Sequence, residues 1–230
     1  MALAAFGYGA SFGILPIGWV VFAALLLYQV GVDTGQFDVM RESIGRLSGD
    51  RRIQAIIIAY SFNAILEGAA GFGVPVAISA ALLVGLGFRP LTAAVLCLIG
   101  NTVPVVWASV GIPLVALATS SGLPLSDLSA TSARILPLVS AILPLWIVRT
   151  MVPWRQTLEV LPAALTAGIS CAVAQFFWGN YVDASLVGLI PGLVSLVSLA
   201  GRLLVWRPRR TWRFPGETEG KEGAPASPKL

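Results

Sequence analysis

Residues 66–75 read Leu-Glu-Gly-Ala-Ala-Gly-Phe-Gly-Val-Pro, and they interrupt an otherwise apolar stretch from Ile53 to Phe88. Inside a helix each glycine costs about 1 kcal/mol relative to alanine, and proline costs about 3 kcal/mol, so a continuous helix is unfavourable here. The pattern predicts two short helices joined by an unwound segment. Unwound backbone at membrane depth is tolerated only where protein or a water-filled cavity satisfies its hydrogen bonds, so the interruption indicates a functional site.

The composition excludes a water-soluble globular protein. Of the 230 residues, 57% are hydrophobic and only 11% are charged, and the mean hydropathy is +0.84. Soluble domains carry about a quarter charged residues, so this chain cannot build a surface that water solvates. We expect an all-α integral membrane protein, a polytopic helical bundle with room for about six or seven spans of roughly 20 residues.

The reactive side chains narrow the possible chemistry. The chain contains no histidine, which excludes histidine-ligated metal sites and histidine proton relays and leaves carboxylates to carry a proton. Cys97 and Cys171 lie in apolar segments and are expected to be free thiols. Without a histidine motif, paired catalytic acids or a cysteine pair within helical reach, neither an enzyme nor a bound cofactor is expected.

A second interruption divides the segment from Leu91 to Thr119, where Gly100-Asn101-Thr102-Val103-Pro104 splits an otherwise spanning helix and Gly111-Ile112-Pro113 is expected to kink its second half. We assign residues 1–213 to a transmembrane domain and residues 214–230 to a disordered cytoplasmic tail or linker. The predicted elements of the domain are a span at about 8–30, a hairpin at 53–88, the broken helix at 91–119, and spans at 132–151, 161–178 and 184–206.

Basic residues set the expected orientation. Five arginines follow the last apolar stretch: Arg202, Arg207, Arg209, Arg210 and Arg213. Cytoplasmic segments are rich in basic residues, so this cluster is interpreted as a cytoplasmic anchor at the C-terminal end, not as a nucleic-acid patch. The arginine-rich loop at 41–52 and Arg89 also belong inside, so the stretch between them begins and ends on one face. Its limbs fall short of the roughly 20 residues that a span needs, which favours a re-entrant hairpin.

Two interrupted segments in succession are typical of a transporter binding site, because half-helix ends present unpaired backbone groups and a dipole to a ligand. We expect the amides of Gly71, Phe72 and Gly73 to face an anionic substrate at the start of the second limb. The alternative is that the glycines only allow close packing of helices.

Three polar side chains accompany the interruptions. Glu67 is the only acidic residue between Asp50 and Asp127, and an ionised carboxylate at membrane depth is costly unless it is paired or faces water. Glu67 is therefore interpreted either as a proton-coupling residue or as a buried partner of the hairpin amides. Asn101 and Thr102 are suited to hydrogen-bond a small hydroxy acid, or else they satisfy backbone groups that the break frees.

Several ordered stretches resemble the L-lactate permease family: LEGAAGFGVPVA (66–77), ALLVGLGFRPL (81–91) and GNTVPV (100–105), with further likeness in GILPIGW (13–19), AQFF (174–177) and VWRP (205–208). The resemblance covers nearly all of the chain before the tail. It implies an architecture similar to the ion-transporter superfamily, in which each of two inverted repeats holds a re-entrant hairpin and a broken helix.

The resemblance also implies a function. It implies secondary active uptake of L-lactate, with D-lactate and glycolate as additional substrates, driven by a proton gradient across the bacterial inner membrane. Family members are longer, so the chain would correspond to about one repeat, and the alternative is a non-transporting truncated fragment or subunit that needs a second chain. The expected partners are the carboxylate substrate, the lipid bilayer and either a missing second half or a homo-oligomer; no nucleic acid is expected.

Overall fold

The computed structural model describes residues 2–12, 14, 18–208 and 210–214. Within them every regular element is a helix and no strand occurs, which confirms the all-α prediction. Helices α9 (Leu125–Met151) and α11 (Leu161–Tyr181) are each long and apolar enough to cross a membrane. A third crossing results if α7 (Pro90–Asn101) and α8 (Ala108–Ser121), which are bent by 72° at a short break, count as one span.

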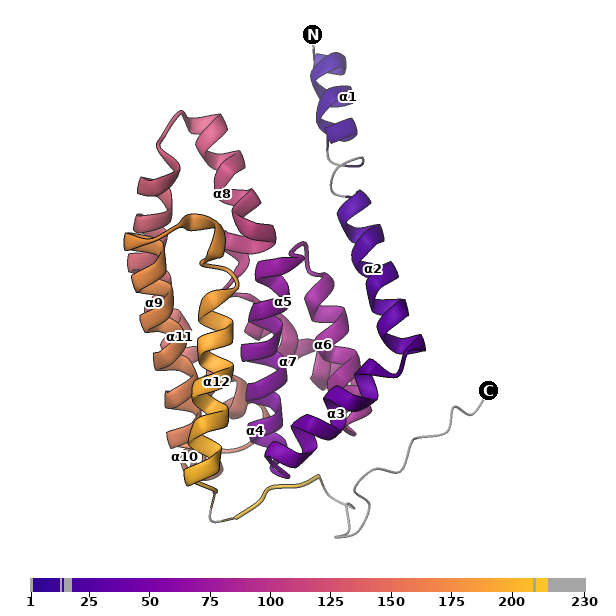
Figure 1. Cartoon of the computed structure of the whole chain (residues 1–230), viewed down its shortest axis with the longest axis vertical. Coiled ribbons are helices and arrows are strands. Elements are labelled where there is room, and N and C mark those ends of the chain that lie inside the picture. Colours follow the sequence, from indigo (N-terminus) through magenta and orange to yellow (C-terminus); the bar gives the residue numbers. More distant parts are fainter. Residues whose placement is uncertain (1, 13, 15–17, 209, 215–230) are drawn as a thin grey trace.

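Helix α11 packs against both α9 and α12 (Ile190–Val205), and these three helices, on the left of Figure 1, are here called the bundle. Small residues bring α9 and α11 together, because a Cβ atom at Gly168 would overlap the carbonyl oxygen of Ala141. Such close backbone approach is how helices associate in lipid, where the hydrophobic effect does not drive them together. The bundle is one wall against which both interrupted segments pack.

The glycine-rich stretch forms a helical hairpin. Its first limb is an unbroken run of α4 (Arg51–Ala55), the π-helical segment η2 (Ile56–Phe62) and α5 (Asn63–Ala69), and its second limb is α6 (Val74–Gly85). The first limb starts earlier than predicted, because the Asp50 carboxylate caps it by accepting a hydrogen bond from the Arg52 amide at 2.9 Å. The π segment lies in the middle of this limb, directly before α5, and such segments are frequent at functional sites.

Buried hydroxyl groups attach the first limb to the bundle. The hydroxyl of Tyr60 donates to the Ser140 carbonyl oxygen at 2.7 Å, and the hydroxyl oxygens of Ser61 and Ser195 lie 2.8 Å apart. These hydrogen bonds reach α9 and α12 respectively, so the hairpin is held between two helices of the bundle.

The second interruption is longer than the sequence indicated. Helix α7 (Pro90–Asn101) ends before the one-turn η3 (Val105–Trp107), and α8 (Ala108–Ser121) follows at once. Regular α-helical geometry begins only after Gly111, because Ser109 and Val110 have φ of 46° and 58°. The break therefore extends from residue 102 to residue 111, well beyond Pro104.

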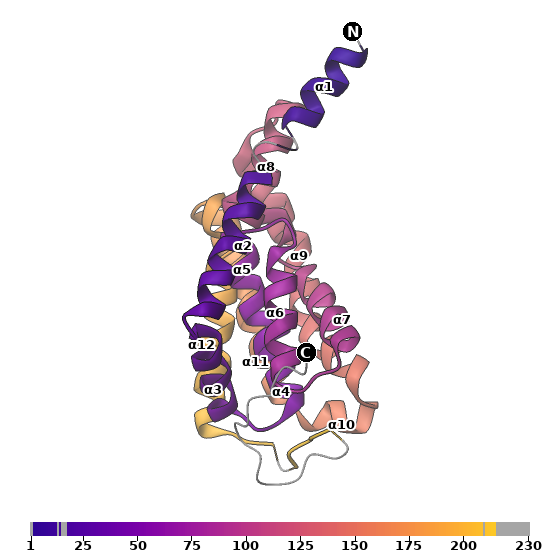
Figure 2. The same cartoon turned by 90° about the vertical axis from the view of Figure 1, so that its right-hand side faces the viewer.

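The described helices have limits that differ from those of the predicted spans. The span predicted at 8–30 overlaps two described helices, α1 (Ala2–Phe12) and α2 (Gly18–Asp33); of the residues between them, 13 and 15–17 lie outside the described part of the chain. The surface helix α3 (Gln36–Leu47) follows. Figures 1 and 2 both show α1 pointing away from the bundle.

The three helices of the bundle also begin or end at other residues than predicted. Helix α9 begins seven residues before the predicted 132, directly after Pro124, and α11 extends three residues past 178. Helix α12 begins six residues after the predicted 184, because Asp183 instead caps the short turn η4 (Ala184–Leu186) by accepting a hydrogen bond from the Ser185 amide at 2.6 Å.

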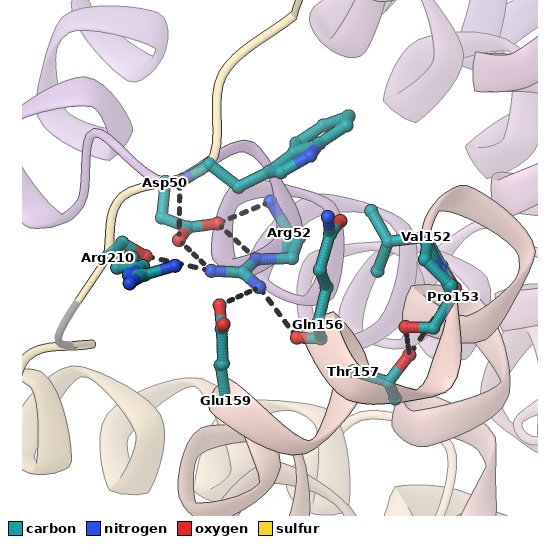
Figure 3. Close-up of polar contacts among 9 residues, drawn as sticks. Asp50, Arg52, Val152, Pro153, Gln156, Thr157, Glu159 and Arg210 are labelled. Atoms are coloured by element: carbon teal, nitrogen blue, oxygen red, sulfur yellow. Dashed lines mark hydrogen bonds and ion pairs between the residues drawn. The ribbon is translucent and has the colours of Figure 1, made fainter.

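A buried ion network, here called the basal network, fixes the end of the molecule where the hairpin begins (Figure 3). The Arg52 side chain is fully buried, and its guanidinium lies 2.7 Å from the Asp50 carboxylate and 2.9 Å from that of Glu159. It also donates to the carbonyl oxygens of Gln156 and Arg210, at 2.6 and 2.9 Å. Burial by itself lowers the pKa of Arg52, but the hydrogen bonds and negative charges of Asp50 and Glu159 outweigh it and raise the pKa.

The segment after α12 returns beneath the hairpin, and we call residues 210–214 the basal strap. The Trp212 amide donates to Asp50 at 3.0 Å, and the Trp212 carbonyl accepts from the Arg51 amide at 3.1 Å. The Phe214 ring packs edge-on against Phe88, which lies just after the second limb of the hairpin. The predicted disordered tail at 214–230 thus starts with a residue that is packed, and its remaining residues lie outside the described part of the chain.

Candidate functional site

The turn of the hairpin contacts the break between α7 and α8. The Ser109 hydroxyl donates a hydrogen bond to the Ala70 carbonyl oxygen, and a Cβ atom at Gly71 would overlap the same hydroxyl oxygen. Two segments that the sequence predicted separately therefore meet at one point. Ser109 was missed because no glycine or proline directly flanks it.

Strained backbone gathers at this contact. Among the described residues, the non-glycine residues with positive φ are Phe72, Ser109 and Val110, at 55°, 46° and 58°. Positive φ is uncommon for non-glycine residues and a genuine outlier for a β-branched residue such as Val110. Such strain persists only where the surroundings hold it, and it clusters at functional sites.

Glu67 lies in the last turn of α5 and is 2% exposed. Its carboxyl group lies near the Gly73 amide and the Asn101 side chain, and its Oε2 has no hydrogen-bond partner. The neighbouring helices α6, α7 and α8 contain no charged residue. A carboxylate therefore lies between the two interruptions without a cation on these helices to neutralise it.

Asn63 joins the same group, although the sequence analysis did not select it. It is fully buried, and its Nδ2 donates to the Cys97 carbonyl oxygen at 3.2 Å and to Asn101 Oδ1 at 3.3 Å. We call Asn63, Glu67 and Asn101 the polar triad. The available signal was its spacing, because residues four apart lie on one face of a helix and Asn63 precedes Glu67 by four.

The predicted substrate residues divide into two groups. Gly73 and Asn101 lie near Glu67, Gly71 contacts Ser109, and Phe72 is half-buried in the same turn. Thr102 is exposed, and its hydroxyl donates to the Ile99 carbonyl oxygen of its own helix at 2.8 Å. For Thr102 the geometry favours the alternative interpretation, a side chain that satisfies a carbonyl group freed by the break.

The glycines also separate by role. A Cβ atom at Gly68 would overlap the backbone of Gly188, and one at Gly100 would overlap the Ala59 carbonyl oxygen, so these two glycines allow close packing. Gly71 and Gly73 have φ of 66° and 77°, which L side chains rarely adopt. The turn glycines are thus required by backbone geometry, and close packing alone does not explain them.

An apolar groove of about 660 Å³ lies elsewhere, on the surface between α11 and α12. Its lining includes Ile169, Val173, Phe177 and Val194. None of the triad residues contributes to it, and its open apolar character is typical of a surface that faces lipid. The candidate site is therefore the triad and the hairpin turn, where polar groups converge.

Comparison with known proteins gives a consistent family. A family model described as L-lactate permease matches residues 1–227. The L-lactate permease of Bacillus subtilis is 48% identical over 211 residues, which are 92% of this chain and 38% of that protein. The glycolate permease of Escherichia coli is 49% identical over the same shares, and the L-lactate permease of Escherichia coli is 45% identical over 93% of this chain and 39% of its own length. The chain thus spans less than half the length of these relatives, and no solved structure matches it.

Proposed function

This chain belongs to the L-lactate permease family, and from that premise we propose that it takes part in secondary active transport of L-lactate, with D-lactate and glycolate as further substrates, coupled to protons. The observation that carries the proposal is the burial of Glu67 between the hairpin turn and the end of α7. The names of the relatives, L-lactate permease and glycolate permease, support the class of substrate.

Backbone groups at the turn suit an anionic substrate. Helix α6 begins at Val74, directly after Gly73, so the positive end of its dipole points towards the turn. The amides of Val74 and Val76 donate to the carbonyl oxygens of Gly71 and Gly73, so the amides offered to the substrate are those of the turn itself. The Asn101 side chain offers a donor and an acceptor for a carboxylate and a neighbouring hydroxyl group. In this proposal Gly71, Phe72 and Gly73 hold the carboxylate, and Asn101 distinguishes a 2-hydroxy acid from a simple acid.

The burial of Glu67 supports proton coupling. Two negative charges, Glu67 and the substrate, cannot share a poorly hydrated site without a large electrostatic penalty. A proton on Glu67 removes one of them, so substrate binding and protonation favour each other. The proton comes from the aqueous phase and is held as the Glu67 carboxylic acid.

The distribution of arginines supports a cytoplasmic C-terminal end. Arg52 and the backbone of Arg210 meet in the basal network, and Figure 1 shows α4, α10 (Trp154–Glu159) and the last turn of α12 at the same end of the molecule. Basic residues concentrate on the cytoplasmic side of bacterial membrane proteins. We therefore propose that the basal network faces the cytoplasm of a bacterial cell and that the hairpin enters the plasma membrane from that side.

Uptake of labelled L-lactate into proteoliposomes with an inward proton gradient tests the proposal. We expect gradient-driven uptake by the chain, loss of that uptake in Glu67→Gln, and retained exchange of substrate between the two faces. Asp127→Asn is the control, because Asp127 is an exposed acid in the first turn of α9. Unchanged acid dependence in Glu67→Gln would exclude Glu67 as the coupling residue.

The competing outcome is a non-transporting fragment or subunit that needs a second chain. It predicts no uptake by the chain alone and co-purification of another hydrophobic protein from the native membrane. Uptake restored by that protein would assign the polar triad to a two-chain carrier.

A further inference from the structure

Two buried oxygen atoms of the polar triad lack a hydrogen-bond partner. They are Oδ1 of Asn63 and Oε2 of Glu67, on residues that are 0% and 2% exposed. Buried polar atoms are almost always paired, so each unpaired one requires an explanation. Asn63 and Glu67 are four residues apart on α5, which places both side chains on one face of the helix.

The orientation of the Asn63 amide follows from its neighbours. A backbone carbonyl can only accept, so the group that faces the Cys97 carbonyl oxygen must be the Nδ2 donor. The same Nδ2 donates to Asn101 Oδ1. The acceptor Oδ1 is therefore the end of the amide that remains available.

An ionised Glu67 cannot use this acceptor, because a carboxylate has only acceptor atoms. A protonated Glu67 can, because its carboxyl hydrogen is a donor. A proton on Glu67 Oε2 would thus provide a donor for which Asn63 Oδ1, on the same face of α5, is an available acceptor, either directly or through one water molecule.

No other charged group near α5 replaces the proton. Among the described residues of the elements packed against α5, the titratable or charged side chains are Tyr60 on η2, Cys97 on α7 and Arg202 on α12. Arg202 is exposed and lies in the last turn of α12, towards the basal network. Helices α6 and α8 and the turn η3 carry no charged side chain.

We propose that Asn63 is a positioning residue that stabilises the protonated form of Glu67 by accepting its hydrogen bond, and that its contact with Asn101 transmits protonation to the break between α7 and α8. This inference rests on the proposed proton-coupled function. Asn101 is the last residue of α7, so a shift of the Asn63 amide moves the end of the helix that the substrate contacts.

Infrared difference spectroscopy on the purified chain tests the inference without requiring transport. The carbonyl stretching band of a protonated carboxyl group, recorded between alkaline and acidic pH, is assigned to Glu67 by its loss in Glu67→Gln. We expect Asn63→Leu, which is similar in shape and lacks the acceptor, to shift this band to higher frequency. Asn63→Ala makes the same prediction if the leucine variant does not fold.

Ser79→Ala is the matched control, because Ser79 is also fully buried and has an unpaired hydroxyl, but on α6. Its band should match that of the unaltered chain. A band that does not move in either Asn63 variant, or a band that Glu67→Gln does not remove, would overturn the inference.

Uptake provides the second readout. Loss of one hydrogen bond to the protonated form should require a roughly tenfold higher proton concentration for half-maximal uptake by Asn63→Leu. Absence of uptake together with the expected band shift would reject the transport proposal and keep the role of Asn63. Normal uptake with an unshifted pH profile and an unmoved band would keep the transport proposal and reject the role of Asn63.

Discussion

The hydroxyl group of Ser109 donates a hydrogen bond to the carbonyl oxygen of Ala70, and this bond joins the turn of the hairpin to the break between α7 and α8. Ala70 is the residue at which α5 ends, and Ser109 has non-helical backbone angles at the start of α8. The second segment therefore supplies a side-chain donor for a backbone carbonyl group of the first. The two interruptions form one structural unit, although 39 residues separate the two partners.

Removing the Ser109 hydroxyl tests this link. Ser109→Ala should lower the free energy of unfolding by about 1 kcal/mol, the net value of one such hydrogen bond. It should also raise the KM for lactate, because the turn amides are no longer aligned with Asn101. The control is Ser132→Ala, whose hydroxyl bonds to the Leu128 carbonyl oxygen of its own helix. Equal effects in thermal unfolding and uptake for both variants would show that the link has no special role.

Substitutions at Gly71 and Gly73 distinguish the cost of backbone strain from the cost of steric overlap. Both have positive φ, but only at Gly71 would a Cβ atom overlap Ser109; at Gly73 no atom lies within 4 Å. Gly73→Ala should cost about 1 kcal/mol of stability from backbone strain alone, and Gly71→Ala should cost more, roughly 2 to 4 kcal/mol. Thermal unfolding in detergent measures the difference, and a smaller loss for Gly71→Ala would contradict the described turn.

Gly100→Ala should be among the most damaging substitutions of a small residue. The added Cβ atom would overlap the Ala59 carbonyl oxygen on the first limb, so α7 and the hairpin must move apart. Overpacking of this kind costs about 1 to 3 kcal/mol. Gly201→Ala is the control, because Gly201 lies inside α12 with no atom within 4 Å of an added Cβ atom. It should leave stability unchanged or increase it by up to about 1 kcal/mol.

The basal network should respond strongly to loss of Arg52. Arg52→Met leaves the Asp50 carboxylate buried without its cation, and breaking a buried pair in this way costs about 3 to 5 kcal/mol. Arg52→Lys should cost less than Arg52→Met, because the positive charge stays. It should still lower the free energy of unfolding, because lysine reaches fewer of the acceptors. Arg155→Met, on an exposed arginine of α10, should change the unfolding free energy by no more than about 0.5 kcal/mol. A similar loss for Arg52→Met and Arg155→Met in thermal unfolding would refute the role of the network.

Local signals in the sequence were sufficient for the two interruptions. The glycines at 68, 71 and 73 and Pro104 disfavour helix wherever they lie, so the hairpin and the broken helix were predicted at nearly the right places. Glu67 stood out because it is an isolated acid in apolar sequence. The family was recognised from the same motifs.

Tertiary contacts explain what the sequence did not reveal. Val110 has a positive φ that its own preferences oppose, so only the packing around the break can impose it. Arg52 and Arg210 were interpreted through charge alone, as loop and anchor residues, whereas a pairing across 158 residues buries one of them. Asn63 is one polar residue in an apolar helix, and its importance depends on Cys97 and Asn101 of another helix.

The basal strap also has a consequence for the order in which the protein is made. Synthesis proceeds from the N-terminus, so Arg52 emerges from the ribosome long before Arg210 and Trp212 exist. Until then, the Asp50 carboxylate lacks the Trp212 amide, and the Arg52 guanidinium lacks the Arg210 carbonyl. The hairpin thus leaves the ribosome before the basal strap does, and the basal network is completed only when the strap follows.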